Sequence, residues 1–190
     1  MTPLVKREDF HPLPPEPNGD KSKTPIFTAV GQALNSWEHV EGQIASLYGV
    51  LLGTSIPVGA IRAYGAIATF NARQSMVNAA SAALFHYQKN DTLRDAIKYT
   101  LENVCKDASA RRNEIAHGIV IKRARGSGSS GGYFLTAGLY SSLKRDMRFE
   151  AKYEYTSRQI KNYAHLFDKL TTSVSQLTDA VLDFQDSLRR

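Results

Sequence analysis

The hydrophobic positions of residues 25–52 recur with a helical period. Two interleaved series of seven-residue steps run through this segment: Phe27, Leu34, Glu41 and Tyr48, and Val30, Trp37, Ile44 and Leu51. Hydrophobic residues spaced three and four apart share one face of an α-helix. The pattern predicts a long helix that begins at Thr24 and Pro25, which suit a helix start, and ends before Gly53.

Residues 57–88 predict a second long helix, rich in alanine and poor in charge, which is typical of a buried helix. Arg73 lies in its middle, and a buried arginine needs an acidic partner. The candidate partners are Glu38 and Glu41 of the first helix, and Glu41 occupies a position where the pattern expects a hydrophobic residue. These three residues form either a dry, paired supporting network or part of an open cleft.

Two more helices follow from the same periodicity. One covers residues 91–117, with Asp91 as a possible cap and Gly118 as its stop. The other begins after Thr156 or Ser157 and carries an unbroken hydrophobic stripe: Ile160, Tyr163, Phe167, Leu170, Val174, Leu177, Val181, Phe184 and Leu188.

Between these two helices the period changes to that of β-strands. The runs IVIKRAR and YFLTAGLYS are joined by a glycine and serine segment, and RFEAKYEYT alternates hydrophobic and charged residues. Residues 119–155 therefore predict a β-hairpin or a three-stranded antiparallel insertion. The predicted fold class is mainly α: four long helices in a bundle, with a small antiparallel β excursion between the third and fourth. This helical domain covers residues 24–190, and residues 1–23, rich in proline and polar residues, form a disordered or extended arm.

The composition indicates the compartment and the partners to expect. The chain of 190 residues suits one domain, and its single cysteine, Cys105, excludes an internal disulfide. The sequence has no signal-like amino terminus, no long apolar run and no cluster of Cys and His. We therefore expect a cytoplasmic protein with no membrane partner, no metal and no cofactor. Long helices in a chain of this size also favour a homodimer.

The net charge of +6 is confined to one region. Residues 118–161 hold nine Lys or Arg and three acidic side chains, which accounts for all of it. A localised basic surface favours a polyanionic partner such as RNA or DNA, although Lys and Arg also simply solvate exposed strands. Aromatic residues of the insertion offer either base stacking or ordinary packing: Tyr133, Phe134, Tyr140, Tyr153 and Tyr155. The candidate RNA-binding residues are Lys122, Arg123, Arg125, Lys144 and Arg145.

The segment RRNEIAHG, residues 111–118, carries the candidate chemistry. His117 can exchange a proton near neutral pH, and Arg112 can hold a phosphate and stabilise its charge. Together with Asn113 they suit metal-independent RNA cleavage. Arg and His near a helix end also offset the helix dipole, which is the structural alternative. Arg112 and His117 are five positions apart, which puts them about 140° apart around an ideal helix. They can meet at one site only if the last turn is distorted or if a second subunit completes the site.

Arg112-Asn113-x-x-x-His117 resembles the signature of the HEPN superfamily, an Arg followed after four to six residues by His. The layout of residues 25–190 is also similar. The resemblance implies an α-helical dimer that cleaves RNA without metal, with Arg112 on the scissile phosphate, Asn113 orienting the site and His117 as acid or base. It also implies a toxin or phage-defence role, with an antitoxin or other protein partner. The alternative is a non-catalytic, HEPN-like dimeric binding or scaffold protein.

Overall fold

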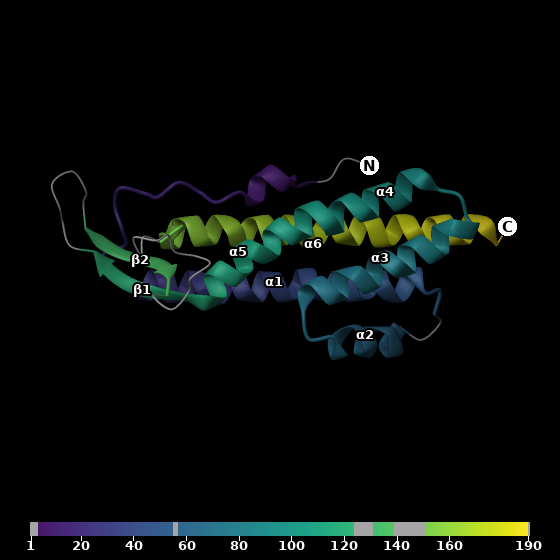
Figure 1. Ribbon diagram of the computed structural model, residues 1–190, viewed down its shortest axis with the longest axis horizontal. Helices are drawn as coiled ribbons and strands as arrows, with labels where there is room; N and C mark the ends of the chain where they lie inside the picture. Colours follow the sequence, from purple (N-terminus) through teal and green to yellow (C-terminus); the bar gives the residue numbers. More distant parts are fainter. Residues whose placement is uncertain (1–3, 55–56, 124–130, 139–150, 190) are drawn as a thin grey trace. The chain divides into compact units, whose positions relative to one another are not determined.

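The computed structural model describes residues 4–54, 57–123, 131–138 and 151–189. They are mainly helical, with a small three-stranded antiparallel sheet (Figure 1). This confirms the predicted fold class at that level, and the four-helix HEPN-like bundle stays a prediction. The helices are η1 (Arg7–Phe10), α1 (Thr24–Leu51), α2 (Pro57–Ala66), α3 (Phe70–Tyr87), α4 (Asp91–Tyr99), η2 (Thr100–Cys105), α5 (Lys106–His117) and α6 (Ser157–Leu188). The strands are β1 (Gly118–Arg123), β2 (Gly132–Ala137) and β3 (Glu154–Tyr155).

The chain divides into two compact units. Unit 1 comprises Met1–Asp9, Glu38–Ser109 and Asp168–Arg190. Unit 2 comprises Phe10–Trp37 and Ala110–Phe167, and contains the sheet and the RRNEIAHG segment.

The first predicted helix matches α1, which ends at Leu51. Gly53 follows with a φ of 63°, and its backbone N–H donates to the Val50 carbonyl at 2.9 Å. This left-handed conformation suits glycine, because a side chain there would be strained. The predicted stop at Gly53 is therefore confirmed.

The single helix predicted for residues 57–88 is wrong, because the chain forms α2 and α3 instead. The side chain of Thr69 starts α3 by accepting a hydrogen bond from the Ala72 N–H at 3.3 Å. Arg73 Nε donates to the carbonyl of Ile67 at 2.8 Å, which satisfies a backbone group in the connection. The alanine-rich pattern continues through the break between Ala66 and Phe70, so the periodicity gives no sign that the helix is interrupted there.

The third predicted helix is present as three consecutive segments, because η2 is a π-helix between α4 and α5. The carbonyl of Leu101 accepts from Gln74 Nε2 at 2.7 Å, which compensates for the altered backbone pairing. Asn90 caps α4 by accepting from the Leu93 N–H at 3.1 Å, so the cap is Asn90 and not Asp91.

In unit 2, the predicted insertion takes its three-stranded form, in the order β1-β2-β3. α5 leads directly into β1 at Gly118, as the predicted stop required. The reason is space: a Cβ on Gly118 would lie 2.7 Å from the side chain of Leu135 and 2.9 Å from the carbonyl oxygen of Glu114. Gly118 is therefore needed for close packing of the helix end on β2.

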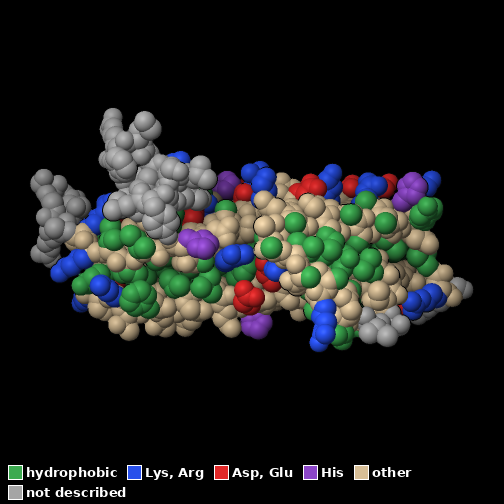
Figure 2. Space-filling view, turned by 60° about the horizontal axis from the view of Figure 1, so that its bottom comes forward, with side chains coloured by type: hydrophobic (Ala, Val, Ile, Leu, Met, Phe, Trp, Pro, Cys, Tyr) green, Lys and Arg blue, Asp and Glu red, His purple; other side chains and the backbone are tan. Residues whose placement is uncertain are grey.

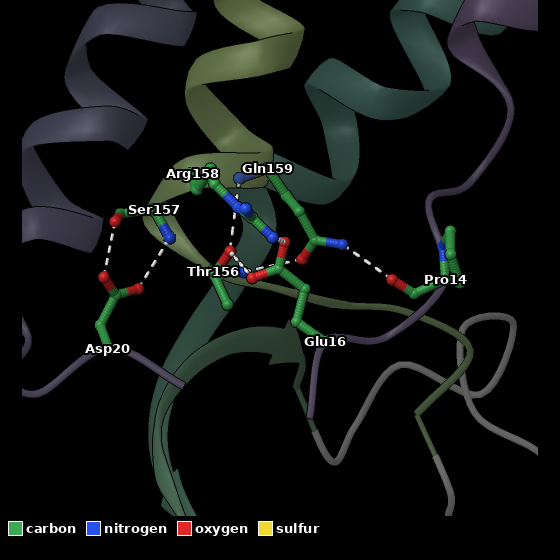
Figure 3. Close-up of polar contacts among 7 residues, drawn as sticks. All are labelled: Pro14, Glu16, Asp20, Thr156, Ser157, Arg158 and Gln159. Atoms are coloured by element: carbon green, nitrogen blue, oxygen red, sulfur yellow. Dashed lines mark hydrogen bonds and ion pairs between the residues drawn. The ribbon is translucent and has the colours of Figure 1, made fainter. Parts of the chain in front are cut away.

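The predicted amino-terminal arm contacts the start of α6 within unit 2 (Figure 3). Glu16 forms an ion pair with Arg158 at 2.6 Å and accepts from Thr156 Oγ1 at 3.0 Å. Asp20 accepts from the backbone N–H of Ser157 at 2.7 Å and from its hydroxyl at 2.6 Å. Two carboxylates thus lie at a helix amino terminus, where the helix dipole favours negative charge.

Thr156 and Gln159 form a reciprocal cap at the same helix start. Gln159 N–H donates to Thr156 Oγ1 at 3.3 Å, and Thr156 N–H donates to Gln159 Oε1 at 3.0 Å. This is the capping-box arrangement, and it identifies Thr156 as the cap of the two predicted candidates. Gln159 also donates to the carbonyl of Pro14 at 2.8 Å, which ties the arm to the cap.

Cys105 is fully buried in unit 1, and this burial raises the pKa of its thiol to about 12. The thiolate is the reactive form, so we expect the native protein to resist a disulfide reagent at about pH 8. The same reagent should label one thiol per chain after unfolding in urea. Rapid labelling of the native protein, at the rate of the unfolded chain, would contradict the buried position.

Candidate functional site

The RRNEIAHG segment forms the end of α5 and the first residue of β1. Its polar side chains differ sharply in exposure. Arg111 and Glu114 are 7% and 5% exposed, whereas Asn113 and His117 are exposed and Arg112 is half-buried. The helix therefore turns one arginine and the glutamate inward, and presents the amide and the imidazole to solvent.

The inward side chains form a buried polar cluster around Glu114. Arg111 Nη2 lies 3.1 Å from Glu114 Oε1, and the Tyr155 hydroxyl donates to Glu114 Oε2 at 2.7 Å. The Tyr153 hydroxyl donates to the backbone carbonyl of Glu114 at 3.1 Å. Both carboxylate oxygens are thus engaged, and the end of α5 is fastened to the chain around β3.

The environment of Tyr155 keeps its hydroxyl protonated. Burial raises the pKa of Tyr155 well above its ordinary value, and the negative charge of Glu114 raises it further. The ring also lies 5.4 Å from that of Tyr163, in an edge-on contact. A protonated hydroxyl can donate to Glu114 at all ordinary pH values, so this cluster is structural.

Arg112 lies on the indole of Trp37, with its guanidinium carbon 5.2 Å from the ring centroid. Trp37 is 1% exposed and contacts Phe167 edge-on, with ring centroids 5.5 Å apart. A cation over a firmly packed indole gains cation–π attraction and loses freedom. The guanidinium is therefore positioned by the core of unit 2.

The α-helix extends through His117, so the distorted last turn, one of the two alternatives from the sequence, is not found. On a regular helix Asn113 and His117 share a face, because they are four residues apart. Arg112 lies about 140° around the helix from His117. The other alternative from the sequence, a second subunit that completes the site, stays a prediction.

The predicted RNA-binding residues are described in part. Lys122 and Arg123 are exposed on β1, and Arg123 forms an ion pair with Glu154. The ammonium of Lys122 lies 5.8 Å from the centroid of the Tyr133 ring. The others lie outside the described residues: Arg125, Lys144 and Arg145. Figure 2 shows Lys and Arg side chains among hydrophobic ones at the end of its face where β1 and β2 lie.

The predicted supporting network is assembled around Glu41 in unit 1. Arg73 Nη1 lies 3.1 Å from Glu41 Oε2, and the Tyr64 hydroxyl donates to the same oxygen at 2.6 Å. Burial and the hydrogen bond to Glu41 raise the pKa of Tyr64. Arg73 thus has its acidic partner in Glu41, while Glu38 is exposed. Glu41 and Tyr64 are buried, which fits a dry network.

Sequence reasoning did not single out Glu114 or the support that Trp37 gives to Arg112. The spacing of Arg111 and Glu114, three residues apart on a helix, was the available signal for an ion pair. Trp37 was placed on the hydrophobic face, and nothing local relates it to a residue 75 positions later.

The described ranges show neither a metal site nor a membrane-spanning helix. They contain no group of three or more His, Cys, Asp or Glu residues arranged to hold a metal ion. Among their helices, none combines the length and the apolar character that crossing a membrane requires.

The Glu114 cluster predicts a large stability loss in Glu114→Ala. This change leaves the buried Arg111 without its carboxylate, which costs about 3–5 kcal/mol when one partner of a buried pair is removed. The matched control is Asp186→Ala, which removes an exposed ion pair of the same i, i+3 spacing with Arg189. Its expected cost is below about 1 kcal/mol. Urea unfolding measures both, and equal costs would contradict a structural role for the cluster.

Comparison with known proteins identifies no relative of this chain: no family model matches it, and no curated protein or solved structure is significantly similar to it.

Proposed function

We propose that this chain is a metal-independent endoribonuclease that acts as a homodimer, with Arg112 and His117 as catalytic residues and Asn113 assisting. The observation that supports this most is the division of the RRNEIAHG side chains. Arg111 and Glu114 are held in a buried cluster, whereas Arg112 is positioned on Trp37 and His117 is exposed. The proposal also rests on the resemblance of this segment to the HEPN signature.

The proposed reaction uses the RNA itself as nucleophile. The ribose 2′-hydroxyl loses its proton and attacks the adjacent phosphorus, and the bond from phosphorus to the 5′ oxygen breaks. The leaving oxygen takes up a proton, so the products are a 2′,3′-cyclic phosphate and a 5′-hydroxyl end. His117 exchanges one of these protons. Arg112 positions the phosphate and stabilises the negative charge that grows on its oxygens, and Asn113 orients the site.

A dimer brings Arg112 of one chain and His117 of the other, which a single helix keeps apart, together at a common site. A two-fold axis near the end of α5 would place two copies of Arg112 and His117 across one groove. Unit 2 exposes hydrophobic side chains suited to such an interface: Phe27 is 58% exposed on α1 and Ile119 is 39% exposed on β1. RNA is the proposed partner, and the role in toxicity or phage defence, with an antitoxin or other regulator, belongs to the same proposal.

The test is cleavage of RNA in the presence of EDTA by the purified protein. We expect the wild type to leave 2′,3′-cyclic phosphate ends. Loss of general acid–base catalysis in His117→Ala should slow cleavage by about 100-fold or more. The matched control is His86→Ala, which removes another exposed histidine and should retain the wild-type rate. Circular dichroism and light scattering verify that fold and dimer are unchanged.

Two outcomes would contradict the assignment. Equal cleavage by wild type and His117→Ala would place the activity outside this site. Inert wild type on mixed cellular RNA and on a panel of short oligonucleotides would favour the non-catalytic dimeric binding protein.

A further inference from the structure

We propose that unit 2 carries a binding platform for single-stranded RNA centred on Tyr133, in which the amino-terminal arm supplies part of the basic surface. The platform comprises Tyr133 and Lys122 of the sheet with Lys21 and Lys23 of the arm. This inference rests on the proposed ribonuclease function, because it identifies where the substrate strand is held outside the catalytic residues.

Tyr133 is distinguished by its exposure. Phe134, Tyr153 and Tyr155 are buried at 3%, 4% and 0% exposure, which makes them packing residues. Tyr133 is half-buried on β2, so part of its ring faces outward. Among the aromatic residues of the insertion that the structure describes, Tyr133 is therefore the one placed to stack on a base.

Two lysines from distant parts of the chain meet at this ring. The ammonium of Lys23 lies 6.0 Å from the ring centroid of Tyr133, and that of Lys122 lies 5.8 Å from it. Cation–π attraction at an exposed ring is weak. A phosphate can draw a lysine off the ring, and the freed face then accepts a base. This exchange replaces a weak contact by base stacking and a charge-assisted contact.

A cavity of about 570 Å³ lies beside the ring, with Lys21, Lys122 and Arg123 in its lining. This volume is within the range of small-ligand sites, and it suits a nucleotide. Asp20 also lines it, but its carboxylate accepts two hydrogen bonds from Ser157, at 2.7 Å and 2.6 Å. The carboxylate of Asp20 is therefore held at the start of α6. The other charged side chains of the lining are positive, and of these Arg123 is paired with Glu154.

The arm is held to the sheet by backbone contacts that leave no room for a side chain. Asp20 and Tyr133 exchange two backbone hydrogen bonds, at 2.9 Å and 2.8 Å. A Cβ on Gly132, whose φ is 158°, would lie 2.6 Å from the backbone of Gly19. This close approach brings Lys23 to the ring and Lys21 to the cavity beside it. Binding thus depends on arm and sheet together.

The position of the ring favours a single strand that continues to His117. Lys122 pairs with Tyr133 in the sheet, and Lys122 lies five positions after His117 along the chain. At about 3.3 Å per residue this distance is about 17 Å. Stacked nucleotides rise by about 3.4 Å each, so about five nucleotides join the two places. A base that stacks on a side chain must also be unpaired, which disfavours a duplex.

The test is binding of fluorescent RNA oligonucleotides to a His117→Ala background, measured by anisotropy so that cleavage does not interfere. Tyr133→Leu should weaken binding of a single-stranded ten-mer by about fivefold or more, with the salt dependence unchanged. Lys23→Gln should lower the slope of log affinity against log salt by about 0.7. The matched controls are Tyr87→Leu and Lys98→Gln, exposed residues of unit 1, which should change neither.

A second variant tests the role of the arm without removing a charge. Gly132→Ala should displace the arm and weaken binding more than Lys23→Gln does, while circular dichroism and thermal unfolding report on the rest of the fold. In protein that retains His117, Tyr133→Leu should slow the cleavage of long oligonucleotides. It should not change the cleavage rate of oligonucleotides shorter than about five nucleotides, which cannot reach both places.

The outcomes separate this inference from the proposed function. Binding that depends on Tyr133, with an inert wild type, would support the platform and overturn the nuclease. RNA cleavage with binding unaffected by Tyr133→Leu would support the nuclease and overturn the platform. Equal affinity for duplex RNA, or for poly-glutamate of the same charge, would also overturn it, since neither offers an unpaired base.

Discussion

The carboxylate of Glu114 is the constraint on which the candidate site depends. It is buried, and such a charge requires full pairing, which Arg111 and Tyr155 provide at 3.1 Å and 2.7 Å. Meeting this requirement fixes the rotation of the last turns of α5. With that rotation set, Asn113 and His117 lie at the surface. The buried pair Arg111 and Glu114 thus determines that Asn113 and His117 face solvent.

Much of the helical framework could be predicted because it follows from local rules. Seven-residue spacing located α1 and α6. Glycine chemistry located the end of α1 at Gly53, and the start of α6 was narrowed to Thr156 or Ser157, of which the structure shows Thr156. The charge of Arg73 on a nearly uncharged helix also predicted an acidic partner, which the structure places at Glu41. In each case the signal lies within one element, or in a buried charge that requires a partner of opposite charge.

What could not be predicted depends on contacts between distant segments or on small changes within a regular pattern. The hydrophobic period continues unchanged through the break before Phe70 and through the π-helix at Thr100–Cys105. The sequence pattern therefore carries no signal for either feature. The contacts of the arm with α6 join residues more than 130 positions apart, such as Asp20 and Ser157. The need for glycine at Gly132 arises from Gly19, which no local rule relates to it.

The same geometry explains why the site and the platform need different kinds of partner. Arg112 and His117 lie on one regular helix, about 140° apart around its axis, and the proposed site therefore includes a second chain. Tyr133 needs no second copy, because its cations come from the arm and β1 of the same unit. In our proposals, binding at the platform is therefore a property of one chain, whereas cleavage requires two. A monomeric variant that binds RNA without cleaving it is the state that this division implies.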